Sequence, residues 1–343
     1  MLKVDCAILH VFDFDSGSTY LSSRPLDLSV RATRSFVQRH LRKISANAES
    51  RHGTFAPDSG FATELSRYLA GEREFVEFTQ EIAQWFWEEL RRAEDLEQCD
   101  LLVADFTDTD AGAADEVAFE GEAGRRFFAV VLLPRRQAFV HEVGGDMNDI
   151  SRVDATLPNP SQKVASYVLV DAQTGAIDFH DKERSVGGEK VALIADRFLQ
   201  CTSEASSHEV IDEVSVIVRD VAEEFGLEPA VEVSRAKAAV ARFADVGESF
   251  SPAEVGREVF AEKPELAERF ERRVAEARLP EEAPVRRGVA NRLTRSHRIR
   301  TDTGVEIAFP SELAEKPGYL DFSTDAEGRI TITVGNVTRV ENR

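Results

Sequence analysis

Residues Lys163 to Leu199 read KVASYVLVDAQTGAIDFHDKERSVGGEKVALIADRFL. The run Val164 to Val170 is rich in β-branched and apolar residues, which is typical of a β-strand. Asp171 to Gly175 has the composition of a turn, so Ile177 to Phe179 can return as a second short strand beside the first. This half of the stretch therefore predicts a hairpin.

The second half of the stretch predicts a helix that packs on this hairpin. After Gly187-Gly188, apolar residues recur at the spacing of one helical stripe. The stripe consists of Val191, Ile194, Ala195, Phe198 and Leu199. We interpret the two glycines as the entry to the helix, because the sequence lacks the GxxxxGK[ST] loop of a phosphate site. Hairpin and helix together predict a core nucleus.

The flanking regions predict an α+β protein of more than one domain, since 343 residues exceed the usual limit of about 250–300 for one core. Strands are expected at Val4–Phe12, Asp100–Phe106, Arg126–Leu133, Ile150–Thr156, Val305–Phe309, Gly318–Phe322 and Arg329–Val334. We predict an N-terminal mixed sheet with helices, a central hairpin and helix, a helical middle region and a small C-terminal antiparallel sheet. The Pro- and Glu-rich linker Leu279–Pro284 separates the last two, which gives domains 1–200, 201–278 and 285–343.

A family resemblance covers nearly the whole chain. It is carried by the helix from Lys190 to Leu199, by the Val4–Phe12 strand before a basic helix, by FATELSRYL and FVEFT within Phe61–Trp87, and by the tail Gly304–Phe309. These features resemble bacterial nucleoid-associated proteins of the YejK/NdpA type. The resemblance implies a cytoplasmic protein of the nucleoid, associated with chromosomal DNA and with the enzymes that manage DNA topology, such as type II topoisomerases.

The overall charge argues against one kind of DNA binding. The chain carries 62 acidic and 42 basic residues, a net charge of −20, and only eight of the basic residues are lysines. Such a surface is typical of proteins from a high-salt cell interior, or of a surface that mimics or avoids nucleic acid. Because non-specific DNA binding comes from neutralising phosphates, bulk charge cannot supply it here.

Two local arginine clusters are the candidate DNA-binding residues. Ser29 is expected to cap a helix that runs to about Ala46, and one side of that helix holds Arg31, Arg34, Arg39, Arg42 and Lys43. The stretch Val285–Arg300 contains no acid and holds Arg286, Arg287, Arg292, Arg295, Arg298 and Arg300. Arginine matches the geometry of phosphate oxygens. The alternative for both clusters is that acidic side chains from elsewhere in the chain pair with them.

A helix expected from Arg73 to Arg92 raises the question of oligomeric state. It has one main apolar stripe, and Val76, Ala83 and Trp87 lie on another side. A helix that is apolar on so much of its girth lies inside a domain or in a subunit contact. We expect a homodimer with Val76 and Trp87 at its interface, with burial in the core as the alternative.

Catalytic and metal-binding patterns are weak. Asp105, Asp108 and Asp110 open an acidic loop that ends at Glu122, but their spacing fails the Ca²⁺-loop pattern, so a solvated loop is expected. The seven histidines lack zinc spacing, and the three cysteines form no CxxC pair. No run approaches the ~18 apolar residues of a membrane helix. We therefore expect no enzyme activity, cofactor, bound metal or membrane contact.

Three functions remain open from the sequence. The first is a nucleoid-associated protein that touches DNA through its arginine clusters. The second is an acidic regulator that binds basic surfaces of protein partners, with type II topoisomerases as the partner that the resemblance implies. The third, remote, is a metal-dependent hydrolase that uses the acidic loop.

Overall fold

The computed structural model describes residues 2–109, 124–144, 147–325, 327 and 329–341. The chain divides into two compact units, Met1–Glu204 and Ala205–Arg343. The first boundary lies close to the expected one at residue 200. The expected linker Leu279–Pro284 separates no units, because it contains β13 (Ala283–Pro284), which pairs with β12 (Ser249–Phe250) inside the second unit.

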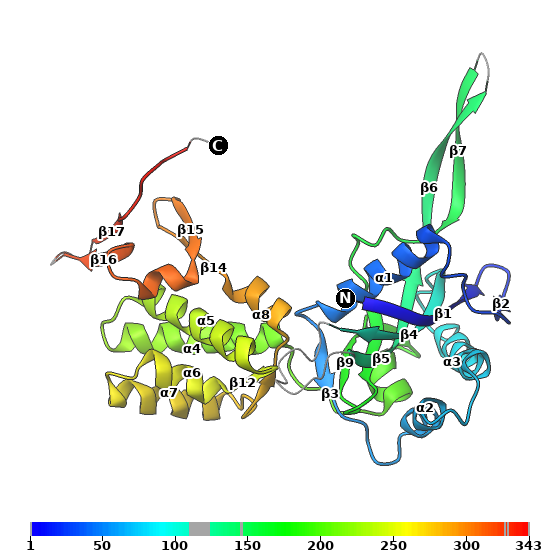
Figure 1. Cartoon of the computed structure of the whole chain (residues 1–343), viewed down its shortest axis with the longest axis horizontal. Helices are drawn as coiled ribbons and strands as arrows, with labels where there is room; N and C mark the ends of the chain where they lie inside the picture. The colour runs from blue at the N-terminus through cyan, green and yellow to red at the C-terminus, as the bar shows by residue number, and fades with distance from the viewer. Residues whose placement is uncertain (1, 110–123, 145–146, 326, 328, 342–343) are drawn as a thin grey trace. The chain divides into compact units, whose positions relative to one another are not determined.

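A seven-stranded sheet forms the centre of the first unit (Figure 1). The α+β class is confirmed, but the sheet, expected as mixed, has only antiparallel pairings among its described strands. In spatial order the strands are β2 (Ser18–Tyr20), β1 (Leu2–Asp13), β4 (Cys99–Asp108), β5 (Arg125–Pro134), β8 (Ser166–Asp171), β9 (Ile177–His180) and β3 (Arg51–Gly53). The tight turn between β8 and β9 makes this pair antiparallel, because two strands joined by a hairpin must run in opposite directions.

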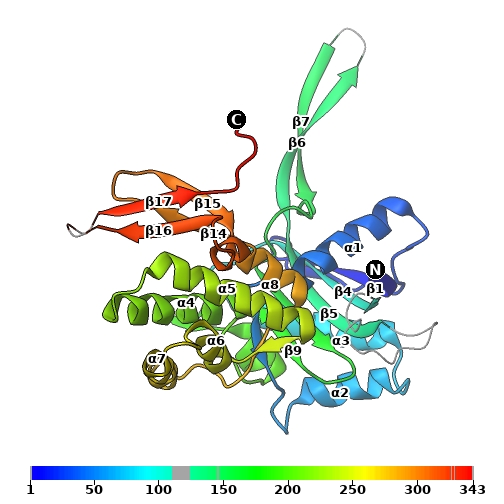
Figure 2. The same ribbon diagram turned by 60° about the vertical axis from the view of Figure 1, so that its left-hand side comes forward.

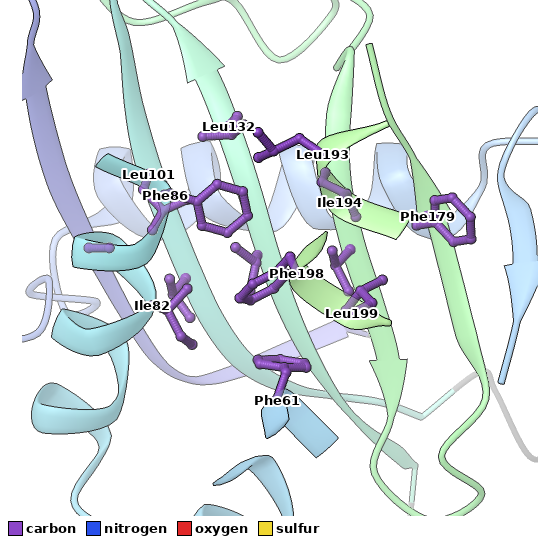
Figure 3. Packing of buried hydrophobic residues seen from close by; sticks show 14 of the residues in the cluster. Phe61, Ile82, Phe86, Leu101, Leu132, Phe179, Leu193, Ile194, Phe198 and Leu199 are labelled. Carbon is purple, nitrogen blue, oxygen red and sulfur yellow. The ribbon is translucent and has the colours of Figure 1, made fainter. Parts of the chain in front are cut away.

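Helices cover both faces of this sheet, which explains why its middle strands are apolar throughout. Every residue from Phe127 to Leu133 is buried, as strands covered on both sides require. On one face lie α2 (Gly60–Leu69), α3 (Phe75–Leu90) and the π-helix η1 (Leu193–Leu199), whose side chains meet the sheet in a shared cluster (Figure 3). On the other face lies α1 (Arg31–Ser45).

The central stretch forms the predicted hairpin of β8 and β9, but the helix entry was wrong. Gly187 and Gly188 form the turn of another hairpin, β10 (Arg184–Val186) with β11 (Glu189–Val191). Both glycines have positive φ, 65° and 81°, which two-residue hairpin turns require and side chains disfavour. The helical segment begins only at Leu193, and four of the five residues of the predicted stripe are buried in it.

A further hairpin of the first unit also lies outside the seven-stranded sheet. Its strands are β6 (Arg136–Gly144) and β7 (Met147–Thr156), which pair with each other and with no other described strand. We call this hairpin the arm; it projects away from the sheet in both ribbon views (Figures 1 and 2). The sequence predicted β7 but missed β6.

The second unit is a helical assembly with small strand pairs attached. Its helices are α4 (Ser207–Glu224), α5 (Pro229–Val246), α6 (Pro252–Val259), α7 (Pro264–Glu276), α8 (Arg287–Thr294) and the 3-10 helix η2 (Ser311–Glu315). Besides β12 and β13, the pairs are β14 (Ser296–Arg300) with β15 (Glu306–Pro310), and β16 (Leu320–Thr324) with β17 (Ile330–Val334). The Phe270 ring lies where a side chain on Gly256 would be, so α6 and α7 can approach closely only with glycine there.

Candidate nucleic-acid interface

The packing of α1 decides which of its side chains reach solvent. Val37, Leu41 and Ile44 are buried against the sheet in one cluster with Ala104 and Val131. The opposite side therefore faces outward. The predicted cap was wrong: the helix begins after Val30, and the Ser29 hydroxyl donates to Asp27 Oδ1 at 2.6 Å instead.

The outward side carries the cations that the sequence predicted. We call Arg31, Arg34, Arg39, Arg42 and Lys43 the α1 basic face. The four arginines are exposed, and Lys43 is half-buried. Arg42 and Lys43 lie in the last turn, where cations interact favourably with the helix dipole.

The α1 basic face has few contacts within the chain. Arg34 Nη1 donates to the carbonyl oxygen of Leu28 at 2.8 Å, and Lys43 Nζ donates to that of Ser161. Within the described part of the chain, no carboxylate lies within ion-pair distance of any of these five cations. Burial lowers the pKa of the neighbouring His40, so its imidazole adds no charge near neutral pH.

The other predicted cluster is partly used inside the chain. We call Arg286, Arg287, Arg292, Arg295, Arg298 and Arg300 the C-terminal arginine segment. Arg287 pairs with Asp245 (Nε to Oδ1, 2.6 Å), and Arg286 and Arg292 also have interaction partners. Among the residues described, the other three arginines of the segment, Arg295, Arg298 and Arg300, have no carboxylate at ion-pair distance.

These arginines also lie in different surroundings. Arg292 and Arg295 line a groove of about 580 Å³ beside β14 and β15. Arg300 instead lines a groove of about 1310 Å³ together with Asp212, Glu223 and Asp302, and Glu306 lies opposite it on β15. A phosphate near Arg300 would therefore meet carboxylates as well.

The residues predicted for a dimer interface lie in or against the core. The Trp87 side chain is buried, and its ring stacks on Phe14 with centroids 4.8 Å apart. Val76 is half-buried against the same cluster. The core alternative explains Trp87, because Phe12 and Phe14 at the end of β1 cover this side of α3. Whether the chain forms dimers stays a prediction.

The acidic loop gives no support to metal chemistry in its described part. Asp105 and Asp108 belong to β4, while Asp110 and the residues up to Glu122 lie outside the described ranges. The Asp105 carboxylate is buried, accepts two hydrogen bonds from Arg126 Nε and Nη2, and accepts another from the Tyr68 hydroxyl at 2.6 Å. Among the described residues, no three histidine, cysteine or acidic side chains are grouped to hold a metal ion.

Burial shifts the pKa values of two histidines and two cysteines far from their ordinary range. Burial lowers the pKa of His10 and of His297 to about 4. Burial raises the pKa of the Cys99 thiol to about 12 and that of Cys201 to about 11. Both thiols are therefore protonated near neutral pH, the opposite of an activated nucleophile.

The arm is the surface feature that the sequence prediction missed. Phe139, Val143 and Ile150 on it are exposed by 73%, 79% and 70%. The signal was weak, because the short runs on both sides of Gly144-Gly145 hold strand-forming residues such as Phe139 and Val140 but show no regular alternation of apolar and polar residues. The runs contain too few apolar residues to indicate a buried strand.

The fold and these surfaces define a two-unit α+β protein with exposed arginine clusters. The chain belongs to the family of the nucleoid-associated protein YejK, whose family model matches residues 8–340. This match confirms the resemblance seen in the sequence, and it supports a nucleoid-associated role. No curated protein matches the chain. None of the described helices is long and apolar enough to span a membrane.

Proposed function

We propose that this chain is a non-catalytic protein of the cytoplasmic nucleoid that contacts chromosomal DNA through the α1 basic face. One observation carries the proposal: five cations on one helix have no carboxylate at ion-pair distance among the described residues, in a chain of net charge −20. A cation gains most from a phosphate when no internal carboxylate already neutralises it.

The shape of the α1 basic face suits a nucleic-acid backbone. Arg31 to Lys43 spans twelve steps of the helix, or about 18 Å at 1.5 Å per residue. Duplex DNA presents about one negative charge per 1.7 Å of its axis, so several phosphates fall within this length. Because the helix is held by its buried side, its arginines are presented on a rigid support.

The exposed Arg295 and Arg298 are a second, smaller set of phosphate contacts in this proposal. The acidic remainder of the surface opposes indiscriminate coating of DNA, so binding depends on these local contacts.

The alternative function, which the negative net charge favours, is binding to a protein partner. With 62 acidic residues, much of the surface suits basic partner surfaces. Type II topoisomerases are the partners that the sequence resemblance implies, and the chain would act on them as a regulator without direct contact to DNA. Two results together would favour this alternative. The chain should bind a purified topoisomerase even after nuclease treatment, and it should fail to bind DNA.

The test of the DNA proposal replaces Arg31, Arg39 and Arg42 with glutamine and titrates a labelled duplex at stepped KCl. Arg34 stays, because its guanidinium also holds the backbone before α1. If these arginines reach phosphates, the slope of log affinity against log salt flattens by up to about three units, at about 0.9 per phosphate contact.

A matched control replaces Arg67, Arg91 and Arg92, which belong to the same unit and pair with Glu64, Glu88 and Glu89. These substitutions remove the same formal charge, so they should leave the slope close to that of the wild type. Equal slopes for the wild type and the α1 variant would overturn the proposal, as would equal flattening by the control.

A further inference from the structure

A large groove lies within the second unit. Residues of α4 and of the start of α5 form its floor, and β14 and the β16–β17 pair form its walls. Both ribbon views show these strands over α4 and α5 (Figures 1 and 2). The groove has a volume of about 1310 Å³, whereas most pockets for small ligands measure about 300–1,000 Å³. Its size therefore suits a segment of a macromolecule.

The β16–β17 pair presents an apolar face to this groove. Residues two apart on a strand, and residues opposite each other in an antiparallel pair, lie on the same face. By this rule Phe322, Ile330 and Ile332 share one face, and all three line the groove. The opposite face of the pair is polar and holds Thr331 and Thr333.

The apolar lining is not filled by the chain itself. Val216 of α4 and Ile299 of β14 line the groove together with the β16–β17 pair. Val216 is exposed by 36% and Ile330 by 55%, although protein interiors are normally packed without voids of this size. Apolar side chains that stay exposed in a concave surface are typical of a binding site.

The stripe of α4 that lines the groove sets its length. Asp212, Val216, Arg219 and Glu223 lie on one side of the helix, and the stretch from the first to the last spans about 16 Å at 1.5 Å per residue. Along this length, 1310 Å³ corresponds to a channel about 10 Å wide. An α-helix with its side chains is about 10–12 Å wide, whereas a single strand needs only about 5 by 10 Å. The groove therefore has room for about three turns of helix.

The carboxylates at the rim of the groove lack cations. Glu223, Glu228 and Asp302 line the groove, and none of the three has a cation at ion-pair distance within the described ranges. Asp212, at the other end of the α4 stripe, pairs only with His208. These side chains can form ion pairs with an occupant that carries positive charge.

The arginines at the rim are mostly paired already. Arg219 Nη2 lies 3.0 Å from Asp220 Oδ1, and Arg329 Nε lies 2.7 Å from Asp325 Oδ2. Arg300 is the exception, because it has no carboxylate at ion-pair distance in the described part of the chain. Unpaired carboxylates therefore outnumber unpaired arginines around the groove.

We propose that this groove binds an amphipathic helix of a protein partner. The apolar side of that helix packs on Val216, Ile330 and Ile332, and its flanking lysines or arginines pair with the rim carboxylates. DNA and a second copy of this chain are both strongly negative, so the rim disfavours them. The proposal goes beyond DNA contact and does not rest on it, because the α1 basic face belongs to the other unit.

Fluorescence anisotropy with a labelled synthetic peptide tests the proposal on the full chain. The probe has about 14 residues, or about four helical turns, with leucines in one stripe and lysines beside it. We expect it to bind in 0.1 M KCl with a Kd of about 100 μM or less and to gain helix on binding, as measured by circular dichroism. A peptide of the same composition, reordered so that it has no stripe, should bind at least about tenfold more weakly.

One pair of variants tests the apolar lining. Val216→Lys with Ile330→Lys places two charges in the groove and should weaken binding of the probe by about tenfold or more. Thr331→Lys with Thr333→Lys adds the same charge on the polar face of the β16–β17 pair. This control should change the affinity by less than about twofold.

A second pair of variants tests the rim. Replacing Glu223, Glu228 and Asp302 with their amides should weaken binding by about threefold or more, since each exposed ion pair contributes modestly. The control replaces three exposed carboxylates of α7 with their amides, which removes the same charge elsewhere in the unit. These are Glu265, Glu268 and Glu276.

Several outcomes would overturn the proposal. A probe that stays unbound up to about 500 μM would do so, as would equal binding of the reordered peptide or binding without a gain of helix. Equal weakening by the groove variants and their controls would have the same meaning, once melting temperatures show that all are folded. Self-association of the wild type that Val216→Lys with Ile330→Lys abolishes would assign the groove to a second copy instead.

Discussion

The α1 basic face and the C-terminal arginine segment have similar charge in the sequence and different surroundings in the structure. All five cations of α1 lack a carboxylate at ion-pair distance among the described residues, whereas half of the six C-terminal arginines are engaged. The first set lies along one helix, while the second is divided between α8 and β14 and between two grooves. A local excess of arginine therefore becomes an available charge only where the fold keeps carboxylates away.

The largest expected effect is on stability, and it should differ between the buried and the exposed side of α1. Leu41 is fully buried against the sheet, so Leu41→Ala should lower the free energy of unfolding by about 2–5 kcal/mol. Arg39→Gln, on the exposed side, should change it by no more than about 0.5 kcal/mol. Urea denaturation measures both. Comparable destabilisation by the two substitutions would mean that the basic face is needed for folding, and the comparison would fail.

The next effect concerns the histidine inside the C-terminal arginine segment. His297 is buried on β14, and Phe309 packs edge-on against its ring. Its Nδ1 atom has no hydrogen-bond partner among the described residues. Burial lowers its pKa to about 4, with Lys237 of α5 contributing. The imidazole is therefore neutral near pH 7 and adds nothing to the positive charge of the segment.

This pKa predicts the direction of a pH effect. The folded-state pKa lies below the unfolded value of about 6.5, so the unfolded chain binds the proton first and stability is lost as pH falls from about 6.5 to 4. The loss from His297 is at most about 3 to 4 kcal/mol, because its pKa falls from 6.5 to about 4 and each pKa unit corresponds to about 1.36 kcal/mol. His297→Gln should reduce the pH dependence of unfolding in this window. An unchanged dependence would show that His297 is accessible and able to carry charge.

The smallest expected effect is on DNA binding, after a substitution that frees one paired arginine. Asp245→Asn removes the carboxylate that pairs with Arg287. If the ion pair keeps Arg287 from contacting DNA, its loss should add up to about one phosphate contact. The slope of log affinity against log salt should then steepen by up to about 0.9. Asp220→Asn is a control, because Asp220 pairs with Arg219 and Arg273, outside the segment. Identical changes from both substitutions would indicate only a general loss of negative charge.

Much of the fold could be predicted because burial leaves a pattern in the sequence. The apolar runs of β4, β5 and β8 predicted strands at the right places, and the stripe that ends at Leu199 predicted the packing of η1. Gly187-Gly188 was misassigned because a glycine pair serves hairpin turns as well as helix entries. The strand β6 was not predicted, because an exposed ribbon buries no side and so leaves no pattern of apolar residues in the sequence.

The candidate site was only half predictable. The positions of the cations on one side of α1 follow from helix periodicity, so the sequence contained them. Their partners did not follow, because Arg287 meets Asp245 of a different helix and no local pattern relates the two. Trp87 shows the same limit, since Phe14 from another element decides that it is buried.

The most direct measurement compares the two clusters on one duplex. One variant replaces Arg31, Arg39 and Arg42 with glutamine, and the other replaces Arg292, Arg295 and Arg298. We predict that the salt slope flattens by up to about three units in the first variant and by no more than about two in the second, since Arg292 already has a partner. A larger flattening in the second variant would contradict the account and assign DNA contact to the C-terminal arginine segment.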